Sequence, residues 1–218
     1  MTNRNKKRIV LFLLFILPLF LYLFLSSGIN NFAKLPVLSN NITDVSLIDD
    51  NKTTTLNGKI SIICFLGNDI GKAKGGLFNL NQKIYKPFYG FKDFQIIALY
   101  PEEKQKEVLE LKADIAAFTD MVKWKFIASS EAEIKALYDS FKTNTSLYSG
   151  YYSSKAYLVD KEAALRGRID DEDEKDGKLY GYDMTSVAVL NNKMKDDVKV
   201  VLAEYRLALK KNNADREI

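Results

Sequence analysis

Residues 59–74 read Lys-Ile-Ser-Ile-Ile-Cys-Phe-Leu-Gly-Asn-Asp-Ile-Gly-Lys-Ala-Lys, and they indicate the fold more clearly than any other part of the chain. Residues 60–66 form an almost unbroken apolar run rich in β-branched side chains, which is typical of a strand buried on both faces of a sheet. Turn formers follow at Gly67, Asn68 and Asp69, and apolar residues then recur at roughly helical spacing. The pattern predicts a strand, a short loop and a helix. In α/β folds, ligands collect at such a loop.

The rest of the chain continues this alternation of strands and helices. The clearest helix follows Ser130, because Ser130 and Glu133 form a capping-box pattern before apolar residues at helical spacing. Further strands are predicted at 45–48, 53–56, 94–99, 124–127, 156–159 and 165–169, and further helices at 102–118 and 186–211. The first two of these strands should form a hairpin. The order predicts an α/β sandwich, a central sheet with helices on both faces.

Composition narrows the possible chemistry. The 218-residue chain has one cysteine and no histidine, so it can form no intramolecular disulfide and no thiolate-rich zinc site. The formal net charge is +4, but four basic residues precede the first apolar run and the remainder is close to neutral. This balance argues against a nucleic-acid-binding protein. We therefore expect no cofactor, no resident metal and no nucleic-acid partner.

The N-terminal region predicts a membrane anchor. Residues 9–25 are uncharged and dominated by Leu, Phe and Ile, at about the minimum length for a membrane-spanning helix. Basic residues precede this run and none follows closely, which predicts a cytoplasmic tail at 1–8 and an exported C-terminal part. A cleaved signal peptide is the alternative, although the apolar region is long for one. The expected location is the inner membrane of a bacterium, with one span and a periplasmic domain.

The exported part divides by composition. Residues 26–43 read as a linker, residues 44–211 as the folded domain and residues 212–218 as a polar tail. An acidic run at 170–176 could in principle hold calcium, but its spacing is not that of an EF-hand loop. We expect this run to be a solvated loop.

Two features around the loop have ordinary structural explanations. Gly67 and Gly71-Lys72 resemble a phosphate-binding loop, but the spacing is one residue short and Ala73 stands where a magnesium-binding Ser or Thr is needed. Cys64 lies inside the predicted strand, so we expect a buried, protonated and unreactive thiol. Neither feature predicts a catalytic site.

Tyrosines gather in a predicted loop at Tyr148, Tyr151 and Tyr152, beside Gly150. Exposed aromatic side chains there could dock a partner. Alternatively, they could cover the domain's own sheet. Of the two possibilities, the sequence favours tyrosines that cover the domain's own sheet.

Five short motifs resemble those of a known family. They are Leu56-Asn57-Gly58-Lys59-Ile60, Phe65-Leu66-Gly67-Asn68, Tyr100-Pro101-Glu102, Lys123-Trp124-Lys125-Phe126, and Tyr157-Leu158-Val159-Asp160-Lys161 followed by Leu165-Arg166-Gly167-Arg168. Together with the order of elements, they resemble the thioredoxin-like domain of the Sco/SenC type, found in membrane-anchored copper chaperones and thiol proteins of cytochrome c oxidase assembly. The resemblance covers most of the exported part. It implies a thioredoxin-like sandwich.

The functional residues of that family are absent. Its Cys-x-x-x-Cys would fall at Asn68 and Lys72, its metal-binding His near Ser153 or Ser154, and its Asp before Pro at Tyr100. Copper(I) sites need soft ligands, and disulfide exchange needs an accessible thiolate with a resolving partner. The resemblance therefore implies a degenerate member that has neither a redox site nor a copper site.

Two classes of function remain open. The first is a non-enzymatic binding or assembly accessory in the biogenesis of a respiratory oxidase or another exported protein, which would bind a protein partner through Asn68, Lys72, Tyr100, Tyr151 and Tyr152. The second is an enzyme of an unrelated class, which would use Asp69, Lys72, Tyr100 and the Tyr151 cluster in a new site. The sequence offers no recognisable nucleophile with a base, which favours the first class. A deep pocket with converging polar groups at the loop would favour the second.

Overall fold

The computed structural model describes residues 3–26, 34–49 and 52–214, and it divides into two units, 1–33 and 34–218. The described part of the first unit is helix α1 (Asn3–Ser26). Its segment Asn5–Phe24, with a mean hydropathy of 2.2, is long and apolar enough to cross a membrane. This confirms the prediction of one N-terminal helix that could span a membrane. The helix begins before residue 9 because the basic tail, rich in Lys and Arg, also favours helix.

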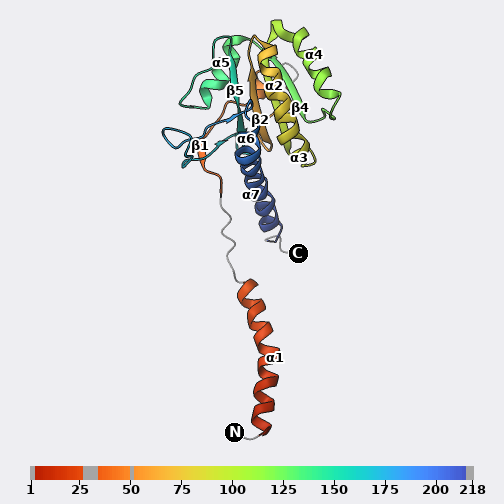
Figure 1. Cartoon of the computed structure of the whole chain (residues 1–218), viewed down its shortest axis with the longest axis vertical. Helices are drawn as coiled ribbons and strands as arrows, with labels where there is room; N and C mark the ends of the chain where they lie inside the picture. Colours follow the sequence, from red (N-terminus) through yellow and green to blue (C-terminus); the bar gives the residue numbers. More distant parts are fainter. Residues whose placement is uncertain (1–2, 27–33, 50–51, 215–218) are drawn as a thin grey trace. The chain divides into compact units, whose positions relative to one another are not determined.

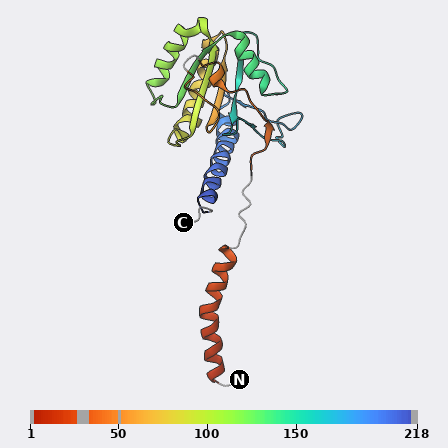
Figure 2. The same ribbon diagram turned by 180° about the vertical axis from the view of Figure 1, so that it is seen from behind.

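One mixed sheet forms the centre of the second unit, and within the described residues it has seven strands. The strands are β1 (Val37–Ser39), β2 (Ile60–Leu66), β3 (Phe94–Pro101), β4 (Trp124–Ser129), β5 (Tyr152–Val159), β6 (Leu165–Arg166) and β7 (Tyr182–Asp183). Their order is β1-β6-β5-β2-β3-β4, and β7 also pairs with β5. Figure 1 labels β1, β5, β2 and β4, and Figure 2 shows the same domain from behind. Strands β2, β3 and β4 are parallel, whereas β5 is antiparallel to β2. Strand β2 therefore lies in the interior of the sheet, as its apolar run predicts.

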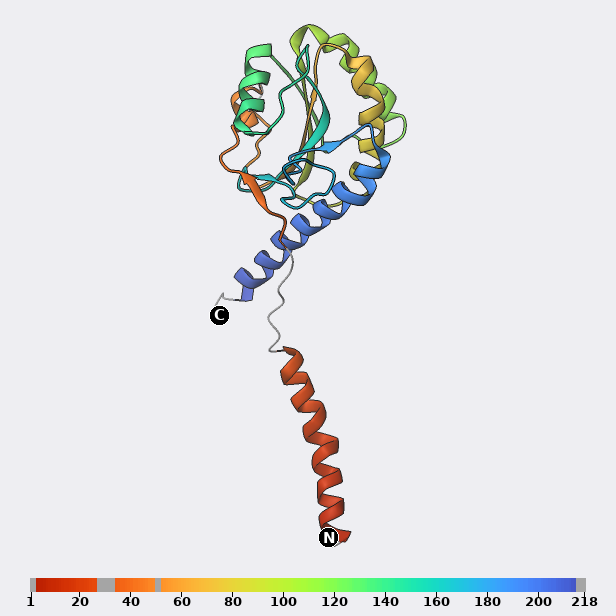
Figure 3. The same cartoon turned by 60° about the vertical axis from the view of Figure 1, so that its left-hand side comes forward.

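Helices cover both faces of this sheet (Figure 3). They are α2 (Ile70–Leu80), α3 (Lys86–Phe88), α4 (Gln105–Ala116), α5 (Glu131–Ser140), α6 (Val187–Val189) and α7 (Lys195–Ala214), with π-helical turns at Asn81–Tyr85 and Leu190–Met194 and a 3-10 turn at Glu102–Lys104. Helices α2, α4 and α7 share one hydrophobic core, and α5 belongs to the other. This confirms the predicted α/β sandwich.

Alternate side chains of β2 supply the two cores. Ile62, Cys64 and Leu66 face the core shared with α2, whereas Ile63 and Phe65 face the core shared with α5. A strand that is buried on both faces needs apolar residues at every position, which explains the continuous run. All seven residues of β2 are buried.

The capping box predicted at Ser130 is confirmed. The Ser130 side chain accepts a hydrogen bond from the Glu133 backbone N–H, and the Glu133 side chain accepts one from the Ser130 N–H. Helix α2 begins in a similar way, because the Asp69 carboxylate accepts a hydrogen bond from the Lys72 N–H at 3.1 Å. Both caps satisfy backbone donors that a helix leaves unpaired at its start.

The hairpin predicted at 45–48 and 53–56 is wrong. Val45–Leu47 forms a 3-10 turn, and the described residues of 53–56 form no strand. The carboxylate of Asp44 accepts hydrogen bonds from Ser46 N (2.8 Å), Thr55 Oγ1 (2.9 Å) and Leu56 N (3.0 Å). One acidic side chain thus binds the backbone groups that strand pairing would otherwise satisfy.

The prediction of a linker up to residue 43 is wrong for its last part. Strand β1 lies in this region and pairs with β6, and both Leu35 and Ile42 are buried. Within β1 only Ser39 is buried, and the Pro, Ser and Asn residues of this region are typical of loops, so the sequence pattern does not reveal the strand. Residues 27–33 of the predicted linker and residues 215–218 of the predicted tail lie outside the described residues.

Most of the acidic run at 170–176 is exposed, as the prediction of a solvated loop requires, and Asp171 is the exception. The carboxylate of Asp171 is buried and accepts hydrogen bonds from Lys193 Nζ at 2.6 and 2.7 Å, while Asp173 stays exposed. Burial raises the pKa of Asp171, but the bonds from Lys193, the bond from the Asp173 N–H and the charges of Lys193 and Arg168 together lower it below its ordinary value of 3.8. Within the described residues, no group of three or more potential ligands could hold a metal ion.

This ion pair predicts a pH dependence of stability. Because the folded-state pKa of Asp171 is lowered, its contribution is present above the unfolded pKa of about 4 and is lost as the pH falls through the folded value. We expect Asp171→Asn to lower the free energy of unfolding by about 1–2 kcal/mol at pH 7, and the deficit should vanish in acid. Urea denaturation at a series of pH values measures this difference. Asp173→Asn removes the exposed carboxylate that pairs with the same Lys193 at 2.7 Å, and as the matched control it should cost less than about 1 kcal/mol.

Candidate functional site

The loop after β2 is held against the loop before β5. Gly67 has a φ of +65°, and a Cβ there would lie 2.5 Å from Gly150 O and 2.7 Å from Tyr152 Cβ. Asn68 N donates a hydrogen bond to Gly150 O at 2.8 Å. Only glycine combines this backbone conformation with this close approach. The carboxyl end of β2 thus brings the two predicted binding segments together.

Asn68 connects this loop to helix α5. Its Nδ2 donates a hydrogen bond to Glu131 Oε1 at 3.1 Å, in the first turn of α5. Its Oδ1 is buried and has no hydrogen-bond partner within the described residues. An unpaired buried oxygen costs free energy, and such groups are uncommon in folded proteins.

Lys72 lies over two stacked tyrosine rings. Its Nζ is 4.7 Å from the ring centroid of Tyr152 and 5.4 Å from that of Tyr148, and the two ring centroids are 6.1 Å apart. At these distances the ammonium group is attracted by the faces of the rings. Tyr148 is 60% exposed, whereas Tyr152 is buried at 4%. Tyr148 thus remains accessible beside the Lys72 ammonium group.

Tyr152 and Tyr100 are core residues rather than surface ones. Both belong to the core shared with α2, and burial raises the pKa of each hydroxyl. The Tyr100 hydroxyl donates a hydrogen bond to Gln105 Oε1, at the start of α4. Of the five predicted site residues, the structure therefore leaves Asn68, Lys72 and Tyr151 at least partly accessible.

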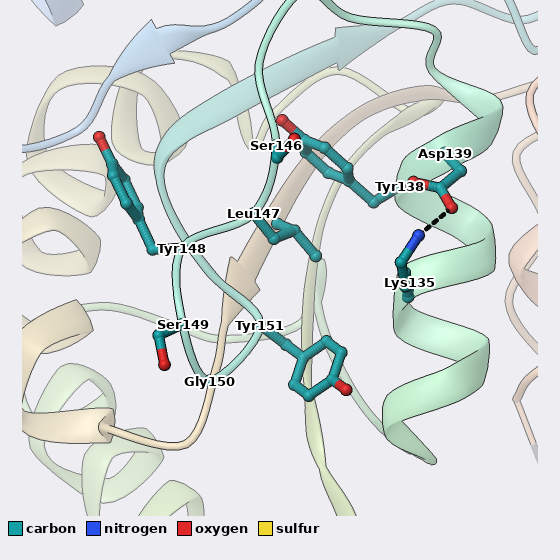
Figure 4. A pocket seen from close by; sticks show the side chains of 9 residues that line it. All are labelled: Lys135, Tyr138, Asp139, Ser146, Leu147, Tyr148, Ser149, Gly150 and Tyr151. Carbon is teal, nitrogen blue, oxygen red and sulfur yellow. Dashed lines mark hydrogen bonds and ion pairs between the residues drawn. The ribbon is translucent and has the colours of Figure 1, made fainter.

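A pocket of about 310 Å³ lies between α5 and the loop that precedes β5 (Figure 4). Its lining includes Lys135, Tyr138, Asp139, Leu147, Tyr148 and Tyr151. Lys135 and Asp139 form an ion pair of 2.5 Å along α5, and Tyr148 lies on the side of the loop away from that helix. The residues of α5 and Leu147 are absent from the sequence prediction, because a Lys–Asp pair on a helix and a Ser- and Tyr-rich loop are ordinary surface features.

The residues at the positions of the family's copper and thiol ligands do not fit such a site. Cys64 is completely buried in β2, and this burial raises the pKa of its thiol. Ser153 Oγ lies 3.1 Å from the Tyr157 hydroxyl, on the face that packs against α5. Asn68 and Lys72 offer no soft ligand for copper. No redox or copper step can be derived from these side chains.

The buried thiol predicts a lack of reactivity. We expect the native protein not to react with iodoacetamide at pH 8, since alkylation needs an accessible thiolate, and we expect one thiol to be labelled after denaturation. Mass spectrometry of the intact chain measures both states. Cys64→Ala should remove only part of one packed side chain, at a cost of about 1–2 kcal/mol. Rapid labelling of the folded protein would contradict the buried position.

Comparisons with known proteins place this geometry in context. No protein-family model matches the chain, and no curated protein matches it. Solved structures do match. One of them is BsSco, a member of the Sco family of cytochrome c oxidase assembly proteins in which a disulfide switch was identified. It aligns with a TM-score of 0.50 at 16% identity, and the alignment covers 78% of this chain and 98% of BsSco.

Two further structures have lower scores. A putative protein disulfide isomerase from Bacteroides thetaiotaomicron has a TM-score of 0.49 at 11% identity, over 78% of this chain and 94% of its own. A SCO1/SenC family lipoprotein from Bacillus anthracis has a TM-score of 0.45 at 14% identity, over 79% of this chain and 99% of its own. At such identities, structural similarity shows the fold and not the activity. The chain therefore has the thioredoxin-like fold that BsSco also has.

Proposed function

We propose that this protein is a membrane-anchored binding module without thiol or copper chemistry, an accessory in the assembly of a respiratory oxidase or another exported protein. The domain would lie on the periplasmic side of a bacterial inner membrane, held by α1. BsSco, which shares the fold, belongs to a family of assembly proteins. The basic residues before the apolar span support the orientation. A C-terminal reporter that is active only outside the cytoplasm tests it.

The surface formed by Lys72, Tyr148 and Tyr151 carries this proposal; we call it the tyrosine surface. It lies at the carboxyl end of β2, where thioredoxin-like proteins keep their reactive loop, and it holds a cation over aromatic rings beside a pocket of about 310 Å³. Tyrosines are among the residue types that dominate binding energy in interfaces. Within the described residues, no acidic side chain forms an ion pair with Lys72, so its charge is available for a carboxylate of a partner.

The enzyme alternative has less support. Asp69 caps α2, Tyr100 is buried, and neither they nor Lys72 line the pocket. A catalytic site needs such groups to converge on one reacting atom. The pocket lies instead beside α5, where Lys135 and Asp139 are already paired. This arrangement fits a recess for a partner's side chain better than a catalytic centre.

Site-specific photo-crosslinking in native membranes tests the proposal. A photoreactive amino acid at position 148 should give discrete adducts, and Lys72→Glu in the same chain should reduce their yield at least tenfold if Lys72 is a binding anchor. Phe118 is the matched control position, because it is 62% exposed and lies at the end of α4, outside the tyrosine surface. Equal adduct yields at positions 118 and 148 would contradict the proposed surface.

A further inference from the structure

A second surface lies at the opposite end of β2. There a pocket of about 340 Å³ is bordered by Phe91, Lys92, Asp93, Lys161, Tyr205 and Arg206. It brings together the start of β2, the segment before β3, the turn after β5 and helix α7. This pocket does not belong to the tyrosine surface, and the similarity in fold to known proteins does not explain it.

Basic side chains dominate this end of the domain. Lys161 Nζ lies 2.5 Å and Lys59 Nζ 3.8 Å from the carboxylate of Asp93. The ammonium group of Lys123 donates a hydrogen bond to Phe91 O, and burial together with the positive charge of Lys59 lowers the pKa of Lys123. Lys92 and Arg206 are exposed and border the same pocket, which brings five basic side chains to this end of the domain. The acidic side chains beside them are Asp93 and the exposed Glu162, which follows Lys161. We call the five basic residues and Asp93 the basic face.

Aromatic side chains accompany these charges. Phe91 is 41% exposed and Tyr89 is 49% exposed, in the turn that leads to Lys92. The Tyr205 ring lies 5.6 Å from Lys161 Nζ. Basic residues combined with aromatic ones at a surface are the combination that binds the headgroup region of a bilayer.

The chain that leads to α1 leaves the domain beside this face. Leu35 N donates a hydrogen bond to Glu204 Oε1 at 2.8 Å, and Leu35 O accepts one from Arg166 Nε at 2.9 Å. Glu204 directly precedes Tyr205 and Arg206 in α7. Eight residue steps separate Ser26 from Lys34. A fully extended chain of that length spans at most about 26–29 Å, so a membrane that holds α1 must lie within reach of this end.

We propose that the basic face docks onto the anionic lipid headgroups of the membrane that holds α1, an inference that rests on the proposed anchoring. Five cations outnumber Asp93 and the neighbouring Glu162, so this end of the domain stays positive and complements a negatively charged leaflet, and the exposed aromatic rings suit the interface of the bilayer. Strand β2 spans about 20 Å between the two surfaces, since the six steps between its seven residues rise about 3.3 Å each. Docking would therefore hold the tyrosine surface away from the bilayer, where a partner can reach it.

Energy transfer from the full chain to labelled lipids tests the docking. The chain, with Cys64→Ala, carries a fluorophore either at Gly90→Cys, where a new Cβ meets nothing within 4 Å, or at exposed Ser149→Cys. Each form is placed in nanodiscs of phosphatidylcholine alone or mixed with phosphatidylglycerol. We expect stronger transfer from position 90 than from 149, an increase with phosphatidylglycerol, and a decrease when salt is added.

Reversing the charge of two basic residues inside the basic face, and of two outside it, tests whether the face itself binds the lipid. Each basic residue near an anionic surface strengthens binding by roughly fivefold, so Lys92→Glu with Arg206→Glu should weaken docking by roughly 25-fold or more. Lys106→Glu with Lys178→Glu makes the same change of charge at exposed positions elsewhere and should leave transfer unchanged. Thermal denaturation checks that both variants are folded.

Several outcomes would overturn the inference. They are equal transfer from positions 90 and 149, no response to phosphatidylglycerol, or an equal loss in both charge variants. Release by inorganic phosphate, at an ionic strength where sodium chloride releases nothing, would mark a pocket for free anions instead. A chain that alkaline carbonate extracts from membranes contradicts the anchoring itself, whereas an integrated chain without lipid dependence contradicts only the docking.

Discussion

Replacing Arg166 with methionine is expected to lower the free energy of unfolding by about 3–5 kcal/mol. Arg166 is buried at 5% exposure, and its guanidinium donates to Asp160 Oδ2 at 2.8 Å, to Glu204 Oε2 and to Leu35 O. The variant leaves two carboxylates without their cation in a largely buried place. Because domains are stable by only about 5–15 kcal/mol, this loss is a large share of the total.

Urea denaturation of the full chain in detergent measures the effect of Arg166→Met. The matched control is Lys135→Met, which removes one partner of the Lys135–Asp139 pair on α5, where the side chains are 63% and 58% exposed. Such a pair contributes about 0.3–0.5 kcal/mol. Equal losses in the two variants would show that the Arg166 network is not buried as described. The same network fixes Leu35, so the variant should also loosen the attachment of β1.

Gly67→Ala is expected to cost about 2–5 kcal/mol, because alanine combines an unfavourable φ of +65° with a collision against backbone. The new Cβ would lie 2.5 Å from Gly150 O and 2.8 Å from Tyr152 N. Neither atom belongs to a flexible side chain. The two loops must then separate, so crosslinking from position 148 should fall together with stability.

Alanine substitutions at two other glycines separate the cost of the positive φ from the cost of the collision with backbone. Gly58 also has a positive φ, +76°, but a Cβ there meets nothing within 4 Å, so Gly58→Ala should cost only about 1–2 kcal/mol. Gly75 lies inside α2 with open space around it, and Gly75→Ala should stabilise by about 0.5–1 kcal/mol. Thermal denaturation ranks the three variants. A Gly67→Ala variant as stable as Gly58→Ala would contradict the close approach of the two loops.

Much of the fold could be predicted from local patterns. The continuous apolar run of β2 and the capping box of α5 each point to one structure, because burial on two faces and helix capping both leave a direct mark on the sequence. Residues 45–56 contain no such sequence pattern. Their turns depend on Asp44, whose hydrogen bonds reach as far as Leu56, and periodicity does not reveal a side-chain acceptor.

The sequence predicts where the candidate site lies, but it does not predict which of its side chains are exposed and which are buried. The loop at Asn68 follows from the end of the apolar strand. The sequence does not predict which of the three neighbouring tyrosines are exposed. Tyr151 has a φ of +61°, and the register of the pairing between β2 and β5 shifts near Tyr152. Such an irregularity changes which side chains point inward. Tyr152 therefore packs in the core while Tyr148 is exposed.

The two ends of the sheet imply a division of roles. The proposed lipid contact lies at the amino end of β2 and the proposed partner contact at its carboxyl end, and β2 itself is buried throughout. Variants of one end should therefore leave the other unaffected, because well-separated sites usually act additively. Lys72→Glu should not change the lipid dependence, and Lys92→Glu should not change crosslinking in detergent.

The central claim is that this thioredoxin-like scaffold acts through binding and needs no thiol. Its most direct test is the yield of the position-148 crosslinks in a chain that carries Cys64→Ala and therefore contains no cysteine at all. The account predicts the same adducts at the same yield as with Cys64 present, in native membranes and with or without a reductant. Loss of those adducts in a Cys64→Ala chain that is still folded would contradict it.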